Sequence, residues 1–142
     1  MTPVQIRAAP LDMILKLCSL DGEGLKQVKE QKDTGYPRII TSLPEADIQF
    51  KGIRAWIMQG ENTQLVFFEM EPSAVVPEHI HEYPQWGMVI DGEMNLIING
   101  KSLICTKGTE YLIPARVKHY ARFYKETRVV DFFSEKSRYR KK

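Results

Sequence analysis

The sequence is poor in cysteine, and its positive and negative charges nearly cancel. Its two cysteines, Cys18 and Cys105, lie far apart and form no CxxC pattern, which favours buried thiols over a disulfide or a catalytic thiol. The 20 basic and 18 acidic residues leave a net charge of +2, so no global field would attract nucleic acid or an anionic membrane. We therefore expect neither as a partner.

The sequence also lacks the hydrophobic segments that direct a chain to or across a membrane. Its first residues, MTPVQIRAAPLDMILKL, do not show the basic start, apolar centre and small-residue cleavage site of a signal peptide. No other run approaches the apolar length of a membrane span. These absences predict a cytoplasmic protein.

The chain has 142 residues, 43% of them hydrophobic, which suits one globular domain with one core. Residues 1–36 contain short helix-like runs broken at Asp21-Gly22-Glu23-Gly24, so we expect a partly helical N-terminal extension. Residues 37–135 form the predicted main domain. The charged residues 136–142 are predicted to be a flexible basic tail.

From Pro37 onward, short runs rich in Val, Ile, Phe, Trp and Tyr alternate with Pro, Gly, Asn and Asp, which is typical of an antiparallel all-β domain. Asp91-Gly92 and Asn99-Gly100 suit two-residue type I′ turns, so we expect three successive strands joined by hairpins. The predicted strands are Arg38 to Thr41, Ile53 to Gln59, Gln64 to Glu71, Val75 to His79, Gln85 to Asp91, Glu93 to Ile98, Lys101 to Thr106, Tyr111 to Ile113, His119 to Phe123 and Thr127 to Ser134.

All three histidines of the chain fall in this β region. His79 and His81 are two residues apart, so the alternation of a strand turns both rings to one face. Gln85 opens the next apolar run, and His119 begins a later one that a long-range pairing would bring opposite the first pair. Imidazole nitrogens with one amide oxygen suit divalent Zn, Ni, Fe, Co or Cu better than Ca or Mg. We predict a transition-metal site; the alternative is that the histidines only pack in the interior.

Two stretches around these residues resemble the motifs of the cupin family. PEHIHEYPQ, from Pro77 to Gln85, continues to Gly92 and is similar to the first cupin motif, with Gln85 in place of its glutamate. GTEYLIPARVKHYARF, from Gly108 to Phe123, is similar to the second motif, with Arg116 and Phe123 replacing a glycine and an asparagine. The shared histidines, glycines, proline and spacing make this a specific resemblance over about residues 60 to 134.

The resemblance implies a jelly-roll barrel, the double-stranded β-helix of small cupins. Position by position, it places metal ligands at His79, His81, Gln85 and His119. A neutral glutamine in place of glutamate leaves more of the ion's charge to polarise a substrate oxygen or a bound water, so Lewis-acid chemistry is at least as well supported as oxygen activation. Small cupins that process unsaturated sugar acids have a similar set, with one more residue before the glutamine.

Strand alternation assigns the residues around the ligands to two faces. Gln85, Gly87 and Val89 should face the metal, where Gly87 leaves room, and Val66, Phe68 and Met70 should line the floor or the ordinary barrel core. The opposite face should hold an apolar group, and a homodimer is the simplest way to cover it. That group comprises Trp86, Met88 and Ile90, together with Trp56.

Three residues near the motifs are candidates for substrate contact or acid and base catalysis, with a solvated loop role as the alternative: Glu78, Tyr83 and Arg116. The first functional hypothesis is a metal-dependent isomerase, lyase or dioxygenase acting on a small polar metabolite such as a sugar acid or keto acid. The second is a non-catalytic cupin in which the metal anchors a small-molecule ligand. A structural protein with a vestigial metal set is the third.

Overall fold

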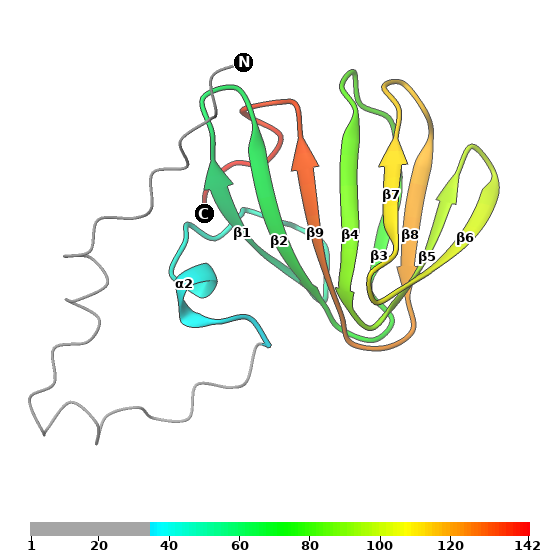
Figure 1. Cartoon of the computed structure of the whole chain (residues 1–142), viewed down its shortest axis with the longest axis horizontal. Helices are drawn as coiled ribbons and strands as arrows, with labels where there is room; N and C mark the ends of the chain where they lie inside the picture. The colour runs from blue at the N-terminus through cyan, green and yellow to red at the C-terminus, as the bar shows by residue number, and fades with distance from the viewer. Residues whose placement is uncertain (1–34) are drawn as a thin grey trace, which may run out of the picture. The chain divides into compact units, whose positions relative to one another are not determined.

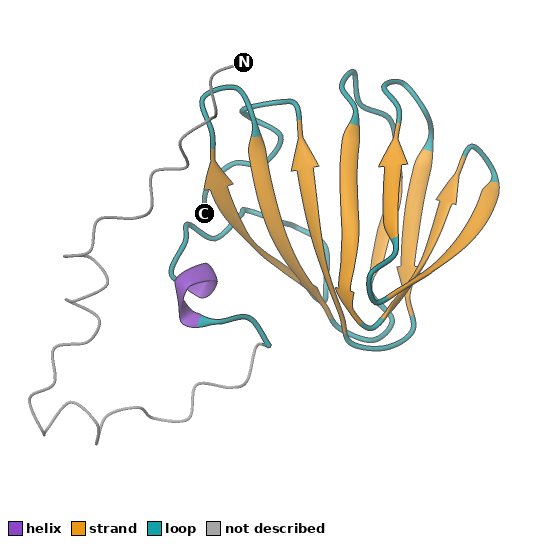
Figure 2. Ribbon diagram, in the orientation of Figure 1, coloured by secondary structure: helices purple, strands orange, loops and turns teal. Residues whose placement is uncertain are grey.

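The computed structural model describes residues 35–142, which form one compact unit of two antiparallel sheets (Figures 1 and 2). The five-stranded sheet has the order β1-β2-β9-β4-β7, and the four-stranded sheet the order β3-β8-β5-β6. This is the predicted all-β jelly roll. The strands are β1 (Ile53–Gln59), β2 (Gln64–Met70), β3 (Val75–His79), β4 (Gln85–Asp91), β5 (Glu93–Ile98), β6 (Lys101–Thr106), β7 (Glu110–Ile113), β8 (His119–Phe123) and β9 (Thr127–Phe133).

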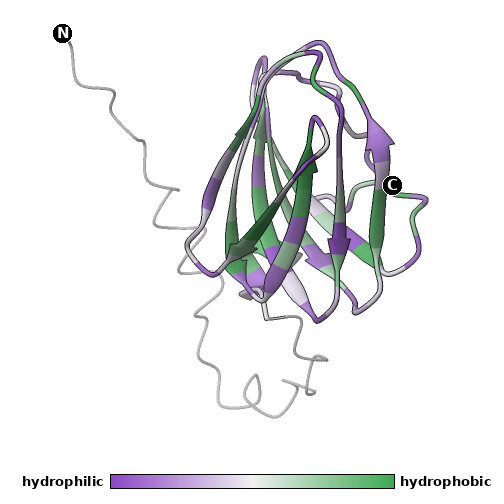
Figure 3. Cartoon of the chain, turned by 90° about the vertical axis from the view of Figure 1, so that its right-hand side faces the viewer, coloured by the Kyte–Doolittle hydropathy of each residue, from purple (hydrophilic) through white to green (hydrophobic). Residues whose placement is uncertain are grey.

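Alternating residues along the strands face the space between the two sheets, and hydrophobic and hydrophilic positions alternate along the ribbon in Figure 3. In β2, Val66, Phe68 and Met70 are all buried, and they belong to the hydrophobic core as expected. In β9, Val129 and Phe133 are buried on the same face, but the inward position between them is held by Asp131. A charged residue therefore sits within an otherwise apolar core.

The predicted hairpins are correct at one turn and wrong at the other. Asn99 and Gly100 have φ angles of 49° and 77°, as a type I′ turn requires, and they join the paired strands β5 and β6. Gly92 also has a positive φ, yet β4 and β5 lie in different sheets. The Asp91-Gly92 segment is thus a crossover between sheets. A glycine permits both a hairpin turn and a crossover. Here β4 pairs with β9 and not with β5, so the chain crosses to the other sheet.

The predicted strand at Arg38 to Thr41 is wrong, because these residues form the short helix α2 (Arg38–Thr41). The carbonyl of Pro37 accepts hydrogen bonds from the amides of Ile40 and Thr41, and the Ser42 hydroxyl donates to the carbonyl of Arg38. None of the helical residues is buried. The β-branched residues Ile39, Ile40 and Thr41 favoured a strand in the prediction, but β-propensity depends on packing against a sheet, and these residues do not lie in one.

The predicted flexible tail at 136–142 is instead packed against the β domain. Tyr139 packs on the core, and its backbone amide and carbonyl both bond to the buried amide side chain of Gln64. The Asp47 amide donates to the carbonyl of Arg140, and Lys141 forms a bridge with Ala46. The charge run suggested a solvated end, but the tyrosine within it supplies an apolar anchor.

Other expectations fall partly or wholly outside the described residues. The helical runs expected in residues 1–36 and Cys18 belong almost entirely to residues 1–34, which are not described. Cys105 is buried and has a free thiol, as predicted. Within residues 35–142, no helix has the length and apolar character needed to cross a membrane.

Candidate metal centre

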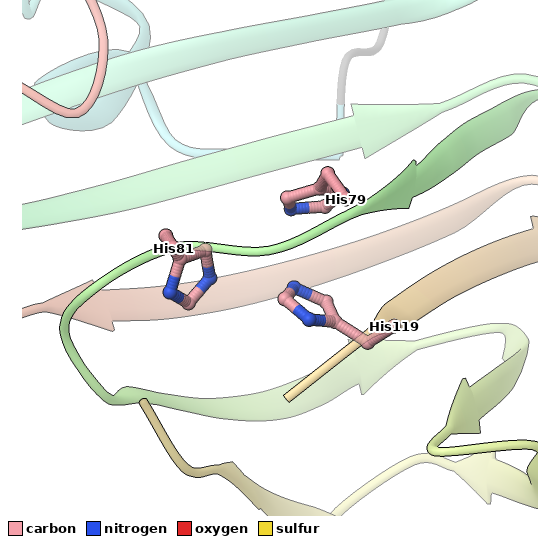
Figure 4. Close-up of side chains that lie close together, drawn as sticks. All are labelled: His79, His81 and His119. Carbon is pink, nitrogen blue, oxygen red and sulfur yellow. The ribbon is translucent and has the colours of Figure 1, made fainter. Parts of the chain in front are cut away.

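Two adjacent strands bring the three histidines together at one end of the four-stranded sheet. His79 ends β3 and His119 begins β8, and the two residues pair directly in the antiparallel register. His81 lies two residues beyond His79, and the intervening Ile80 is half-exposed and points away. Figure 4 shows the three rings turned toward one another from these two segments.

The ligand atoms of His79, His81 and His119 all lie within 4.8 Å of one another. The rings of His79 and His119 are closest, with centroids 4.1 Å apart, and those of His81 and His119 are 4.8 Å apart. Typical Zn–N bonds are about 2.1 Å, so two ligand nitrogens of a tetrahedral site are about 3.4 Å apart. Small ring movements would therefore bring all three nitrogens to ligand distance.

Each of the three imidazoles is held by a backbone carbonyl through its Nδ1 atom. His79 Nδ1 lies 2.8 Å from the Pro77 oxygen, His81 Nδ1 2.6 Å from the Tyr83 oxygen, and His119 Nδ1 2.9 Å from the Val117 oxygen. A carbonyl only accepts, so Nδ1 carries the proton in each ring, and Nε2 presents a lone pair. This is the arrangement that protein structures use to orient metal-binding histidines.

Burial favours the neutral form of two of these rings, His79 and His119. It lowers the pKa of His119 to about 4, and the nearby imidazoles of His79 and His81 act in the same direction. Burial also lowers the pKa of His79. His119 Nε2 is fully buried, and among the described residues it has no hydrogen-bond partner. A buried acceptor without a donor is costly, and a bound cation would satisfy it.

Gln85, the first residue of β4, faces the same cluster. Its side chain is buried, and Oε1 lies 3.1 Å from His81 Nε2. With the proton on Nδ1, His81 Nε2 is an acceptor, so two acceptors lie side by side. That pairing is unfavourable by itself but suits two ligands of one cation. The residues present thus fit a divalent transition metal, with three nitrogens and one amide oxygen available.

A buried acidic residue that the sequence analysis missed lies behind Gln85. Asp131 accepts a 2.5 Å hydrogen bond from the Tyr111 hydroxyl and another from the Gln85 amide. Burial raises the pKa of Asp131 to about 6, and these two hydrogen bonds oppose the rise. A Cβ added to Gly87 would lie 2.2 Å from both Asp131 Oδ1 and the Tyr111 ring. This pair therefore fills the space beside Gly87, and the expectation that Gly87 leaves room beside the metal is wrong.

Two cavities meet the cluster. The inner one, about 40 Å³, is bordered by His79, Gln85, His119 and Asp131 with apolar side chains around them. The outer one, about 320 Å³, is lined by His79 and by a second residue absent from the predicted site, Arg138. The Arg138 guanidinium lies 4.8 Å from the ring centre of Tyr139 and 5.7 Å from that of Phe133. The positively charged side chain of Arg138 therefore lies in the cavity that leads to the histidines.

The three predicted acid–base candidates occupy different surroundings. Glu78 is exposed and lines the outer cavity. The Tyr83 ring stacks on His81 with centroids 4.7 Å apart, and burial raises its pKa. Arg116 borders neither cavity; its exposed side chain lies 3.6 Å from Glu82, and its φ of 63° is the conformation that favours a glycine. Its backbone amide donates to the His81 carbonyl and so supports the histidine loop.

A signal for Asp131 was present in the sequence. The run TRVVDFF alternates so that positions 129, 131 and 133 share a face, and an acidic residue among inward valine and phenylalanine side chains marks a buried polar site. Arg138 had no comparable signal, because it lies in a run of charged residues. Only the packing of Tyr139 brings it to the cavity.

Comparisons with known proteins agree with this fold. Residues 66–133 match the family described as the cupin domain. A search of curated proteins found no match. Among solved structures, an RmlC-like cupin from Shewanella frigidimarina has a TM-score of 0.63 at 21% identity, covering 69% of this chain and 87% of that one.

Two further structures are similar at comparable levels. KdgF from Halomonas sp. has a TM-score of 0.58 at 21% identity, covering 66% of this chain and 87% of its own. The polyketide cyclase RemF from Streptomyces resistomycificus has a TM-score of 0.60 at 20% identity, covering 72% and 81%. Identities at this level establish shared architecture. The jelly roll described here, which carries a three-histidine cluster that can hold a metal, is the cupin fold.

Proposed function

We propose that this chain is a metal-dependent cupin enzyme that acts on a small metabolite carrying a carboxylate, such as a sugar acid or keto acid, by isomerase or lyase chemistry. One observation carries the proposal. Three buried or half-buried imidazoles, each with Nδ1 tied to a backbone carbonyl, place their ligand atoms within 4.8 Å of one another, and the Gln85 oxygen lies beside His81 Nε2. That donor set favours Zn, Ni, Fe, Co or Cu.

A carboxylate substrate is supported by the charge at the approach to the site. Arg138 lines the outer cavity with His79, and its Nε atom is buried without a hydrogen-bond partner among the described residues. Guanidinium groups bind carboxylates through paired, charge-assisted hydrogen bonds. The outer cavity, at about 320 Å³, has the volume of a small-metabolite site.

The neutral ligand set favours Lewis-acid chemistry. A bound divalent ion would polarise a carbonyl or hydroxyl oxygen of the substrate. Arg138 would orient the carboxylate, while the apolar residues of the inner cavity, including Phe68 and Met70, would exclude water. Glu78 and Tyr83, on either side of the histidines, are the groups we propose for proton transfer.

The proteins with similar structures differ in the reactions that their names describe. Besides KdgF and a polyketide cyclase, they include salicylate 1,2-dioxygenase from Pseudaminobacter salicylatoxidans, with a TM-score of 0.57 at 13% identity. It covers 59% of this chain and 26% of its own. One fold therefore supports unrelated chemistries, so the reaction has to be inferred from the residues of the site.

The test has two stages. Elemental analysis of the purified full chain should find one transition-metal ion per chain, and His79→Ala should remove it. The chain loaded with that metal should then convert one or more members of a panel of uronates and keto acids, with Arg138→Gln raising KM more than it lowers kcat. Stoichiometric metal with tight acid binding but no turnover would support the non-catalytic alternative. Oxygen consumption would replace the isomerase or lyase assignment with a dioxygenase.

A further inference from the structure

We propose that Asp131 is a positioning residue that determines which end of the Gln85 amide faces the three histidines. The inference rests on the proposed metal site and extends it to a residue outside the ligand set. It also gives a physical reason for the glutamine at position 85, where the cupin motif has glutamate.

The β4–β9 pairing places the two side chains together. Gln85 pairs with Phe133 and Gly87 pairs with Asp131, so Gln85 and Asp131 are diagonal neighbours on the inward face of the five-stranded sheet. Gln85 is 7% exposed and Asp131 6% exposed. Both border the inner cavity with His79 and His119. Neither side chain can satisfy its polar atoms with bulk solvent.

The hydrogen bonds at Asp131 have a fixed direction. The Tyr111 hydroxyl donates to Oδ1 over 2.5 Å, and the side-chain amide of Gln85 also donates to the carboxylate. An ionised carboxylate can only accept. The NH₂ group of Gln85 must therefore face Asp131, which directs Oε1 to its position 3.1 Å from His81 Nε2.

The close fit at Gly87 holds this arrangement in place. Any side chain there would overlap Asp131 Oδ1 and the Tyr111 ring, each 2.2 Å from the added Cβ. Because the pair fills the space beside β4, the carboxylate has little freedom to turn from Gln85. Gly87 thus supports the orientation of the amide.

The same geometry explains why residue 85 is not a glutamate. A carboxylate at position 85 would face the Asp131 carboxylate, so two acceptors would meet in a buried site with no donor between them. Glutamine at 85 and aspartate at 131 therefore act as a matched pair. The reversed pair, glutamate at 85 and asparagine at 131, would also satisfy every hydrogen bond. In that pair the asparagine would accept from Tyr111 and donate to the glutamate.

This reversal provides the experiment. We measure the affinity of the full chain for Zn²⁺ alone by chelator competition, and the thermal unfolding of each metal-free variant. Asp131→Asn presents an NH₂ group to Gln85, which turns the amide so that its own NH₂ faces the histidines. We expect the affinity to fall about 10- to 100-fold, the usual effect of losing a residue that orients a ligand. In the Gln85→Glu/Asp131→Asn double variant, at least tenfold of that affinity should return.

The outcomes separate this proposal from the proposed function. Wild-type affinity in Asp131→Asn, or no gain in the double variant over Asp131→Asn, would overturn the positioning role while leaving the metal site intact. If Asp131→Asn does not fold, Gln85→Glu is compared with the double variant, and equal Zn²⁺ affinities would overturn it. A wild-type chain that binds no transition metal would overturn the proposed function and this inference together.

Discussion

Strands β4 and β9 have polar side chains on their buried inner face and large apolar side chains on their exposed outer face, the reverse of the usual pattern in a β-sheet. On the inner face, Gln85 and Asp131 are polar yet buried, and the two are hydrogen-bonded to each other. On the outer face, Trp86 is 44% exposed and Phe132 36% exposed, with ring centroids 5.8 Å apart. Met88 and Leu112 extend this apolar surface, which lines an open hollow of about 600 Å³.

This difference suggests that the inner face contributes to the metal site and that the outer face forms an interface. Polar side chains are uncommon in a core, and Gln85 and Asp131 border the cavity beside His79 and His119, so their place on the inner face points to chemistry. Exposed apolar side chains are common singly but not as a continuous row across three strands, and such a row points to an interface. The following changes test whether the faces are independent, beginning with the largest expected effect.

Removing a histidine from the metal site, which the inner face of β4 and β9 adjoins, should severely weaken metal binding. His119→Ala deletes the buried Nε2 that has no partner among the described residues. We expect the Zn²⁺ affinity to fall by more than the roughly 100-fold that loss of an orienting residue can cause. The added metal should also no longer raise the melting temperature, as measured by differential scanning calorimetry. Stoichiometric binding by this variant would contradict the site.

Filling the space at Gly87 should affect the inner face through packing. Gly87→Ala places a methyl group against Asp131 Oδ1 and the Tyr111 ring. Overpacking of this kind typically costs about 1–3 kcal/mol, and we expect a loss of that size in the free energy of unfolding. Urea denaturation of the metal-free chain measures it. An unchanged midpoint would show that the Asp131–Tyr111 pair moves freely.

Acidification should destabilise the wild-type chain through His119. Its folded pKa of about 4 lies below the unfolded value of about 6.5, so the unfolded state binds more protons between these values and stability falls as the pH drops. Between pH 7 and pH 5 this amounts to about 2 kcal/mol. Asp131, whose pKa is raised, contributes in the opposite direction. A His119→Gln variant keeps Asp131, so this contribution cancels when the wild type is compared with the variant.

Urea denaturation of the metal-free wild type and His119→Gln at both pH values provides the measurement. The wild type should lose more stability than the variant on acidification. Equal losses in the two chains would mean that His119 is protonated in the folded protein as readily as in the unfolded one.

Changing the outer face should leave the inner face unaffected. We expect this surface to mediate a homodimer, and Met88→Lys combined with Leu112→Lys should produce a monomer in sedimentation equilibrium. Zn²⁺ affinity should remain within about twofold of wild type, because both side chains point away from the histidines. If the wild-type chain is itself a monomer in this experiment, the prediction of a homodimer is wrong. Loss of metal affinity in the variant would show that the two faces are coupled.

Much of the fold was predictable because strand alternation is a local property. The alternation correctly assigned Gln85 and Val89 to the inner face and Trp86 and Met88 to the outer face. It assigned Trp56 to an exposed apolar group, but Trp56 is 2% exposed, with Tyr36 packed edge-on against it. Local pattern gives the side of a strand, whereas a neighbouring segment decides whether that side is covered.

The sequence by itself determined that His79 and His81 share a face, because a spacing of two residues on an extended chain permits nothing else. It also predicted the tight turn at Asn99-Gly100, where both residues have positive φ angles. Only the tertiary structure decided that β8 pairs with β3 to bring His119 opposite His79, and that β9 pairs with β4 to place Asp131 behind Gln85. These contacts join residues far apart in the chain, so they depend on how the two sheets close over a common core and not on any local spacing.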